Sequence, residues 1–256
     1  MQPPNKPNAV MNTLTTTFVN RLRNRDEAAW FELWETFGPV LRAQLAKWGK
    51  GRIGVETVRD LTQETLAALS DSIDRYDPAR GARFSTWLRS IAKHALGDEI
   101  DRRKALKRGG GRKPTELDER FMSQAANVEA DGIYQQNVFH ANVYAAIRKT
   151  EAESDFMQFQ VYRMRVFDGT AGKGVADQLG ISEPTVSRHL QRVRDLLRKR
   201  LAEVVGRFSF TADEAAEVER AGLGSDDEMF DEALCEIYHQ QSRLILDDET
   251  AASQAF

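Results

Sequence analysis

The chain has 256 residues, of which 41% are apolar, enough for one large or two small soluble domains. It contains no run of about 18 apolar residues, which excludes a transmembrane helix, and its single cysteine, Cys235, excludes an internal disulfide framework. The net charge is only -3, but residues 206–256 hold 13 acidic and 3 basic residues, while the rest hold 33 basic and 26 acidic ones. This asymmetry favours a polyanion-binding body with an acidic tail, although ordinary solvated surfaces would give the same totals.

The N-terminal part of the chain is expected to be helical after a short polar lead. Residues 1–12 carry three of the seven prolines, and we expect them to be disordered. Apolar residues then recur every three or four positions over 26–103, which indicates helices. The pair Gly38-Pro39 interrupts the first run and should kink or split that helix. We therefore predict a helical domain over 13–103.

A second helix is predicted at about 56–73, with two contrasting faces. Its buried face is expected to hold Val58, Leu61, Thr65, Leu69 and Ile73. The opposite face carries Asp60, Gln63, Glu64 and Asp71. That face is either a solvated polar surface or a docking surface for a basic partner.

A loop at 74–83 and a third helix at 84–103 form a basic element. The turn-forming residues of "DRYDPARGAR" predict the loop, which contains Arg75, Arg80 and Arg83. The apolar face of the helix is predicted to hold Phe84, Trp87, Leu88, Ile91 and Ala95. Its other face carries Thr86, Arg89, Ser90 and Lys93.

The glycine-rich, charged segment 104–130 has no apolar periodicity, so we expect a flexible linker between two domains. Helical periodicity resumes over 131–205. Within it, Ala176, Gly180 and Val186 have the spacing of a helix-turn-helix. The small residue lets the second helix cross, the glycine supplies a backbone angle with positive φ, and the aliphatic residue fills the angle between the helices.

The second helix of this motif is the predicted DNA-reading element. Its buried stripe should be Val186, Leu190, Val193, Leu197 and Leu201. Ser182 can cap it, and Pro184 is tolerated in its first turn. Near its N-terminal end the side chains off the stripe suit bases and phosphates, and we call them the reading residues: Thr185, Ser187, Arg188, Gln191 and Arg192. Four further cations, Arg194, Arg198, Lys199 and Arg200, should lie nearer the DNA backbone. The competing interpretation is a generic amphipathic helix with a charged outer face.

The tail, 206–256, is predicted to form helices with capped, acidic first turns. Its apolar residues fall on one broad stripe: Met229, Phe230, Ala233, Leu234, Ile237, Tyr238 and Leu244. Such a stripe needs a partner surface. The tail could pack on the helix-turn-helix domain or on another protein, or its acids could cover the basic face and restrain DNA binding.

Three segments in this order resemble bacterial RNA polymerase sigma factors: "DLTQETLAAL", "FSTWLRSIAKHALGDEIDRRK" and "GVADQLGISEPTVSRHLQRVRDLLRKRL". The two-domain layout is similar to the extracytoplasmic function (ECF) group, and the likeness covers about 20–103 and 131–203. Each motif alone is moderately specific, and their combination is strongly so. Minimal members of the group end near Val205, so the acidic tail is a departure.

The resemblance implies an all-α fold of two small helical domains joined by a flexible linker, plus a helical C-terminal extension. It also implies three contacts. Asp60, Gln63 and Glu64, the docking residues, would bind the clamp of core RNA polymerase. The melting residues would recognise and open the promoter -10 element: Tyr76, Arg80, Arg83, Thr86, Trp87, Arg89, Ser90 and Lys93. The reading residues would recognise the -35 element, and the linker would pass near the RNA exit path.

Two aromatic melting residues leave alternatives open. The family flips a base out of the duplex, which costs a few kcal/mol that new contacts must offset. Stacking on an aromatic or arginine side chain contributes about 1–3 kcal/mol per base. Trp87 also lies on an apolar face, so a core role is favoured for it. Tyr76 lies in the loop and fits either role.

No motif indicates catalysis, and we expect no enzyme activity, no cofactor and no metal site. The histidines His94, His140, His189 and His239 lack metal-ligand spacing, and "GTAGKG" at 169–174 lacks the ending of a phosphate loop. Cys235 fits a helix core better than a nucleophile.

We expect a cytoplasmic bacterial protein whose partners are core RNA polymerase and promoter DNA. An anti-sigma factor is a further candidate partner. The alternatives are a stand-alone helix-turn-helix regulator and an adaptor acting through its acidic tail.

Overall fold

The computed structural model describes residues 16–77, 83–107, 132–208, 218, 220–224 and 226–253. These residues form helices joined by turns, with no strand among them, so the all-α prediction is confirmed. The predicted disordered N-terminus (1–12) and linker residues 108–130 lie outside the described residues. No described helix is long and apolar enough to cross a membrane.

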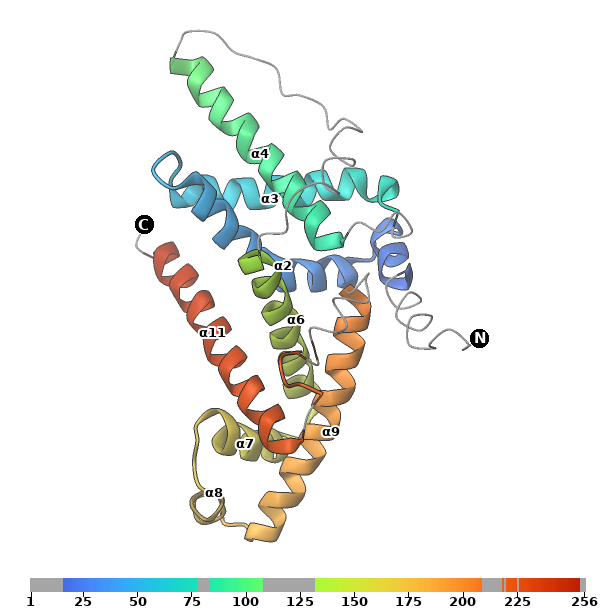
Figure 1. The fold of residues 1–256 in the computed structure, drawn as a ribbon, viewed down its shortest axis with the longest axis vertical. Helices are drawn as coiled ribbons and strands as arrows, with labels where there is room; N and C mark the ends of the chain where they lie inside the picture. The colour runs from blue at the N-terminus through green and yellow to red at the C-terminus, as the bar shows by residue number, and fades with distance from the viewer. Residues whose placement is uncertain are drawn as a thin grey trace. The chain divides into compact units, whose positions relative to one another are not determined.

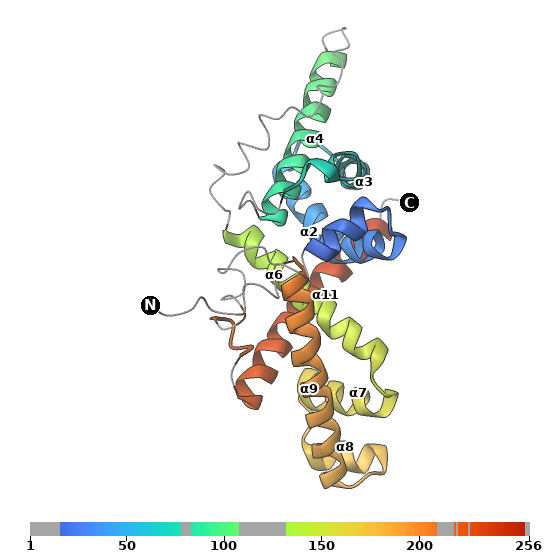
Figure 2. The same cartoon turned by 90° about the vertical axis from the view of Figure 1, so that its right-hand side faces the viewer.

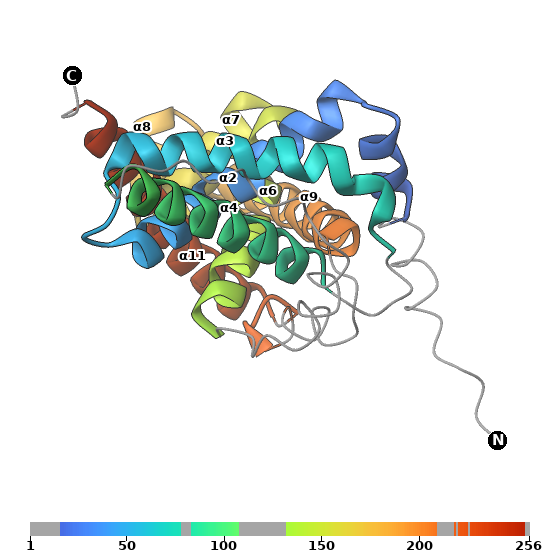
Figure 3. The same ribbon diagram turned by 90° about the horizontal axis from the view of Figure 1, so that it is seen from above.

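The chain forms two compact units, the N-terminal unit (Asn12–Val138) and the C-terminal unit (Phe139–Ile245). The N-terminal unit contains a short helix of residues 16–23, then α2 (Glu27–Gly49), α3 (Val55–Ser72), the 3-10 turn η1 (Ile73–Arg75) and α4 (Phe84–Lys107). Helices α2, α3 and α4 pack against one another (Figures 1 and 3). Because α4 ends at Lys107, it extends four residues into the linker predicted over 104–130.

Helix α2 is continuous through Pro39, so of the predicted kink or split the split does not occur. Asp26 caps its start by accepting a hydrogen bond from the Ala29 N–H at 3.1 Å. Leu33, Phe37 and Leu41 are at most 1% exposed on both sides of the proline. Burial of this stripe outweighs the hydrogen bond that proline removes, because tertiary packing supplies most of a helix's stability.

The apolar faces predicted for the second and third helices are confirmed. Val58, Leu61, Thr65, Leu69, Ile73, Phe84, Trp87, Leu88 and Ile91 are buried, and Ala95 is half-buried. Thr65 can lie on this face because its hydroxyl donates to the Leu61 carbonyl at 2.6 Å, which satisfies the buried polar group.

The C-terminal unit is built around the long helix α9 (Glu183–Phe208). It also contains most of α6 (Gly132–Glu153), then α7 (Phe156–Tyr162), the π-helical turn η3 (Arg163–Phe167), α8 (Gly172–Leu179) and most of α11 (Asp227–Ser253). The first residues of α6 and the last residues of α11, from Leu246 on, belong to the N-terminal unit. Helices α7 and α8 pack against α9 (Figure 2).

Candidate nucleic-acid interface

The helix-turn-helix predicted between α8 and α9 has the expected geometry. Gly180 ends α8 in the left-handed conformation, with φ 65° and ψ 32°, and its N–H donates to the Ala176 carbonyl. Ala176 and Val186 are 6% and 3% exposed, so the helices meet over a small residue and an aliphatic one. Ser182 precedes α9, and its carbonyl accepts the Val186 N–H at 3.0 Å. The turn therefore fixes how the start of α9 projects.

The start of α9 presents the reading residues on the surface of the C-terminal unit. Thr185 is half-buried, and the other four are exposed, while the predicted buried stripe of this helix is confirmed. Arg188 donates to the Thr185 hydroxyl at 3.2 Å, and that hydroxyl lies 2.9 Å from the Ser182 hydroxyl. The Gln191 amide donates to Asp195 at 3.0 Å. These exposed contacts orient both side chains.

The tail helix α11 packs on the helix-turn-helix unit, one of the arrangements considered for it. Phe230, Leu234 and Ile237 are at most 4% exposed. The Tyr238 ring stacks on Phe167 with centroids 4.1 Å apart. Two members of the predicted stripe, Met229 and Leu244, remain 51% and 39% exposed. The core of the C-terminal unit therefore includes apolar residues from the first half of α11.

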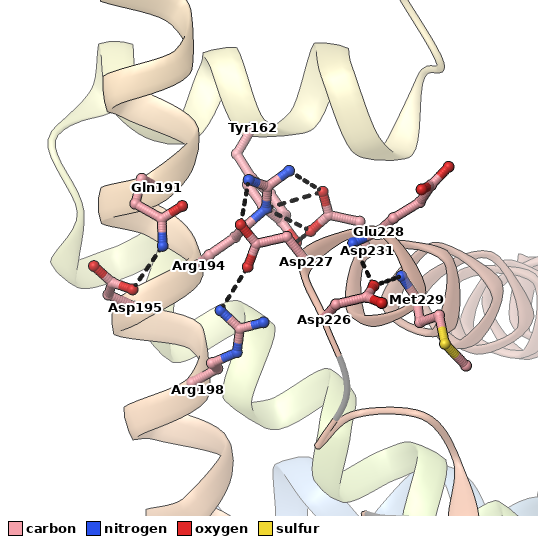
Figure 4. A network of polar contacts seen from close by, with 10 residues as sticks. All are labelled: Tyr162, Gln191, Arg194, Asp195, Arg198, Asp226, Asp227, Glu228, Met229 and Asp231. Carbon is pink, nitrogen blue, oxygen red and sulfur yellow. Dashed lines mark hydrogen bonds and ion pairs between the residues drawn. The ribbon is translucent and has the colours of Figure 1, made fainter.

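The acids of α11 contact two arginines of α9 rather than the reading residues (Figure 4). Arg194 donates to Asp231 at 2.6 Å and to Asp227 at 3.2 Å, and Arg198 donates to Asp227 at 2.9 Å. Asp231 also accepts the Tyr162 hydroxyl at 2.8 Å. Burial raises the pKa of Tyr162, so it stays a neutral donor, and the hydrogen bond from Arg194 to Asp231 raises the pKa of Arg194.

In the N-terminal unit, the two aromatic melting residues are buried. Tyr76 and Trp87 are 2% and 4% exposed, and their rings stack with centroids 4.7 Å apart. The Phe84 ring meets the Tyr76 ring edge-on at 5.6 Å. Arg80 lies outside the described residues, and Lys93 is exposed. Neither Tyr76 nor Trp87 can stack on a base unless this cluster opens.

The start of α6 contacts several melting residues on α4, a feature that the sequence pattern does not reveal. The Tyr134 hydroxyl donates to the Ser85 carbonyl at 3.0 Å, and burial raises the pKa of that hydroxyl. The Gln135 amide donates to the Thr86 hydroxyl at 3.4 Å. The Arg89 guanidinium lies 5.4 Å from the Tyr134 ring centroid. Arg83, Arg89 and Ser90 are half-buried.

The docking residues lie together on the exposed face of α3. Partial burial raises the pKa of Glu64, and the like charges of Glu99 and Asp60 raise it further. Glu99 itself accepts hydrogen bonds from Arg102 at 2.6 Å and from Arg103 at 2.5 Å. The C-terminal half of α4 thus places anionic and cationic groups beside the acidic face of α3.

Within the described ranges, no three histidine, cysteine or acidic side chains lie where they could hold a metal ion. Cys235 is a free, half-buried thiol, and burial raises its pKa.

Residues 33–106 match the family model of Sigma-70 region 2. The matched segment runs from α2 to α4 and therefore contains the docking residues and the melting residues. The likeness to Sigma-70 region 2 is therefore limited to this segment of the N-terminal unit and does not extend to the C-terminal unit. Comparison with curated proteins and with solved structures found no match.

Proposed function

We propose that this protein is a sigma factor of the ECF type that binds core RNA polymerase, recognises the -35 and -10 promoter elements and promotes promoter melting. The observation that carries the proposal is the Sigma-70 region 2 match over 33–106, which indicates binding to core polymerase and promoter melting. The proposed division is a -10 domain over 13–107, a linker over 108–130, a -35 domain over 131–205 and a regulatory extension over 206–256.

The proposed polymerase contact is the N-terminal part of the acidic face of α3, which holds the docking residues. Asp60, Gln63 and Glu64 are exposed and contribute little to the core of the N-terminal unit. A cationic surface on the clamp would neutralise Asp60 and Glu64 and relieve the like-charge repulsion that raises the pKa of Glu64. This contact therefore supplies both affinity and orientation.

The proposed -10 contact is α4 with the loop before it. Arg75 and Lys93 are exposed cations that can bind the phosphate backbone, which contributes affinity without sequence information. Thr86 and Arg89 can contact the DNA as well once the start of α6 moves away from α4. The Tyr76–Trp87 stack would capture a flipped base only after it opens, and the exchanged stacking then offsets part of the cost of unpairing.

The proposed -35 contact is the start of α9. Arg188 and Gln191 are suited to bidentate pairing with guanine and adenine edges in the major groove, and Ser187 and Arg192 can bind phosphates beside them. The positive φ of Gly180 and the buried Val186 set the angle at which this helix enters the groove.

The second candidate is a stand-alone regulator, which the complete helix-turn-helix and its exposed reading residues favour. Such a protein would bind duplex DNA without core enzyme and would not need the docking residues.

The double variant Asp60→Asn with Gln63→Ala discriminates between these functions. It removes a charge and two hydrogen-bonding groups from the docking residues, so we expect binding to purified core polymerase to weaken at least tenfold, about 1.4 kcal/mol. Asp71→Asn is the matched control because Asp71 is an exposed acid at the C-terminal end of the same face of α3, about two turns beyond Glu64 and outside the docking residues. Equal core affinity for the double variant and the wild-type chain would refute the proposed docking surface.

A further inference from the structure

One face of α9 carries a row of polar side chains that continues beyond the reading residues. Ser187, Gln191, Arg194 and Arg198 follow at positions i, i+4, i+7 and i+11, so they share one side of the helix. In a helix-turn-helix the N-terminal residues of the second helix approach base edges. Arg194 and Arg198 come two to three turns later, where a helix leaving the groove passes the phosphate backbone.

Arg194 is committed to the fold of the C-terminal unit. Its side chain is 17% exposed, and that of Asp231 is 15% exposed. Asp231 accepts hydrogen bonds from both Arg194 and the buried Tyr162 hydroxyl. Withdrawing Arg194 would leave a carboxylate that is largely removed from water without its counter-ion, which is strongly unfavourable. Arg194 therefore acts as an anchor for α11.

Arg198 is held in a more exposed contact. Its side chain is 33% exposed, and that of its partner Asp227 is 44% exposed. Asp227 also borders a cavity of about 640 Å³ that opens between α11, α9 and η3, so water and ions reach this carboxylate. A partly exposed pair of this kind contributes little to stability and is screened by salt. The Arg198 guanidinium also lies 4.4 Å from the centroid of the buried Phe230 ring, so it exchanges one anionic partner for another at small cost where it keeps this ring contact.

We propose that Arg198 is an additional DNA-backbone contact and that Asp227 withholds it. The ligand is a phosphate of duplex DNA, and the Asp227 carboxylate occupies the guanidinium that would bind it. The inference rests on the proposed function in one respect, namely that α9 enters a DNA groove. Arg194 pairs with both Asp231 and Asp227, which holds the competing carboxylate of Asp227 beside α9. The tail thereby limits the backbone affinity of the helix while leaving the reading residues exposed.

The test measures binding of the full-length chain to a fluorescent, mixed-sequence duplex of about 30 base pairs by anisotropy, at roughly 50 to 200 mM salt. Any duplex suffices, because a phosphate contact does not depend on sequence. For Asp227→Asn we expect roughly three- to tenfold tighter binding at the lowest salt and a slope of log K against log salt that is steeper by about 0.9, one extra phosphate.

Glu228→Gln is the matched control. Glu228 is an exposed acid in the same first turn of α11, so the variant has the same net charge and the same effect on the helix dipole. We expect it to leave the slope unchanged. Equal effects of the two variants would show a long-range charge effect and would overturn the proposal.

Arg198→Gln, alone and combined with Asp227→Asn, completes a double-mutant cycle. In the wild-type chain it should change affinity less than twofold, because Asp227 already occupies this side chain. In the Asp227→Asn chain it should cancel the gain in affinity and slope. An equal loss in both backgrounds, or no duplex binding by any of the variants, would contradict the proposal. If Asp227→Asn did not fold, as judged by circular dichroism, a large loss from Arg198→Gln alone would still contradict it.

Failure of this proposal is distinguishable from failure of the proposed function. Transcription by core polymerase in the presence of the chain tests the sigma activity and does not depend on Arg198. A chain that supports transcription but shows no Asp227–Arg198 coupling on DNA overturns only the inference about the tail.

Discussion

Gly180 has the backbone conformation on which the placement of the reading residues depends. Its φ of 65° is in the region that residues with a Cβ adopt at a cost of about 1–2 kcal/mol. We therefore expect Gly180→Ala to lower the free energy of unfolding of the C-terminal unit by that amount, measured by denaturant titration. Gly172→Ala adds the same methyl group at the first residue of α8, where the nearest atom that the Cβ would meet is the Arg165 Nε at 3.8 Å. A loss from Gly172→Ala as large as that from Gly180→Ala would mean that the left-handed turn is not the cause.

Arg188 should contribute specificity, while Lys199 should contribute only backbone affinity. Both are exposed on α9, but Arg188 lies among the reading residues and Lys199 lies three turns later. Arg188→Ala is expected to cost about 1–3 kcal/mol and to relax the preference at one base pair. Lys199→Ala should weaken binding equally on all sequences and reduce the salt slope by about one. The measurement is the affinity of the holoenzyme for a promoter fragment that it binds and for the single-base-pair variants of that fragment. If Arg188→Ala left the base preference unchanged, Arg188 would not be one of the reading residues.

Glu99 makes the stability of the N-terminal unit depend on pH. Hydrogen bonds from Arg102, with further contributions from Arg103, lower its pKa below the ordinary value of 4.5, although burial acts in the opposite direction. The carboxylate therefore contributes stability that is present above pH 4.5 and is lost as the pH falls through the lowered pKa. We expect Glu99→Gln to be less stable at pH 7 by about 1 kcal/mol and to lose less stability on acidification. Parallel stability–pH curves of the variant and the wild-type chain, from thermal melts, would contradict this.

At the scale of elements, α11 is expected to be part of the C-terminal unit rather than an independent appendage. Asp231→Asn removes the charge that pairs with Arg194, so it should lower the stability of the unit by about 2 kcal/mol. The neighbouring Glu232 is exposed, and Glu232→Gln should stay within about 0.5 kcal/mol of the wild-type value. Thermal unfolding of the two variants makes the comparison. A stability for Asp231→Asn equal to that of Glu232→Gln would mean that α11 is held by its apolar stripe alone.

The elements that the sequence predicts well are those governed by local periodicity. The apolar faces of α3, α4 and α9, and the turn at Gly180, follow from spacing that the sequence displays directly. The local propensity of Pro39 favours a break in α2. The helix nevertheless continues, because buried residues on both sides of Pro39 stabilise it. The local pattern thus identifies faces and turns, and packing decides whether a helix with a poor residue continues.

The candidate site is less predictable than the fold, because its unexpected contacts join distant parts of the chain. The hydrogen bond between Arg194 and Asp231 joins residues 37 positions apart in the sequence, and the one between Ser85 and Gln135 joins residues 50 positions apart. The periodic pattern shows that α11 has a buried stripe but not which surface receives it. The same holds for Tyr134, whose place on a helix face gives no sign that it will meet α4. The burial of Tyr76 was likewise undetermined, since a loop aromatic can pack inward or outward.

At the scale of the whole molecule, charge is distributed unevenly along the chain. The basic residues are concentrated in the first 205 positions, and the acidic tail brings two carboxylates, Asp227 and Asp231, to cations of α9. The proposed sigma activity uses both signs of charge. In this proposal the docking residues of α3 contact the polymerase and the cations of α4 and α9 contact DNA, so neither surface would substitute for the other.

The most direct measurement is transcription in vitro by purified core polymerase on genomic DNA fragments, with and without this protein. The account predicts discrete transcripts that depend on the added chain and that disappear with the Asp60→Asn and Gln63→Ala double variant, while Asp71→Asn leaves them intact. The contradicting result is a transcript pattern that does not change when the folded chain is added, in a reaction where the chain binds duplex DNA without the core enzyme.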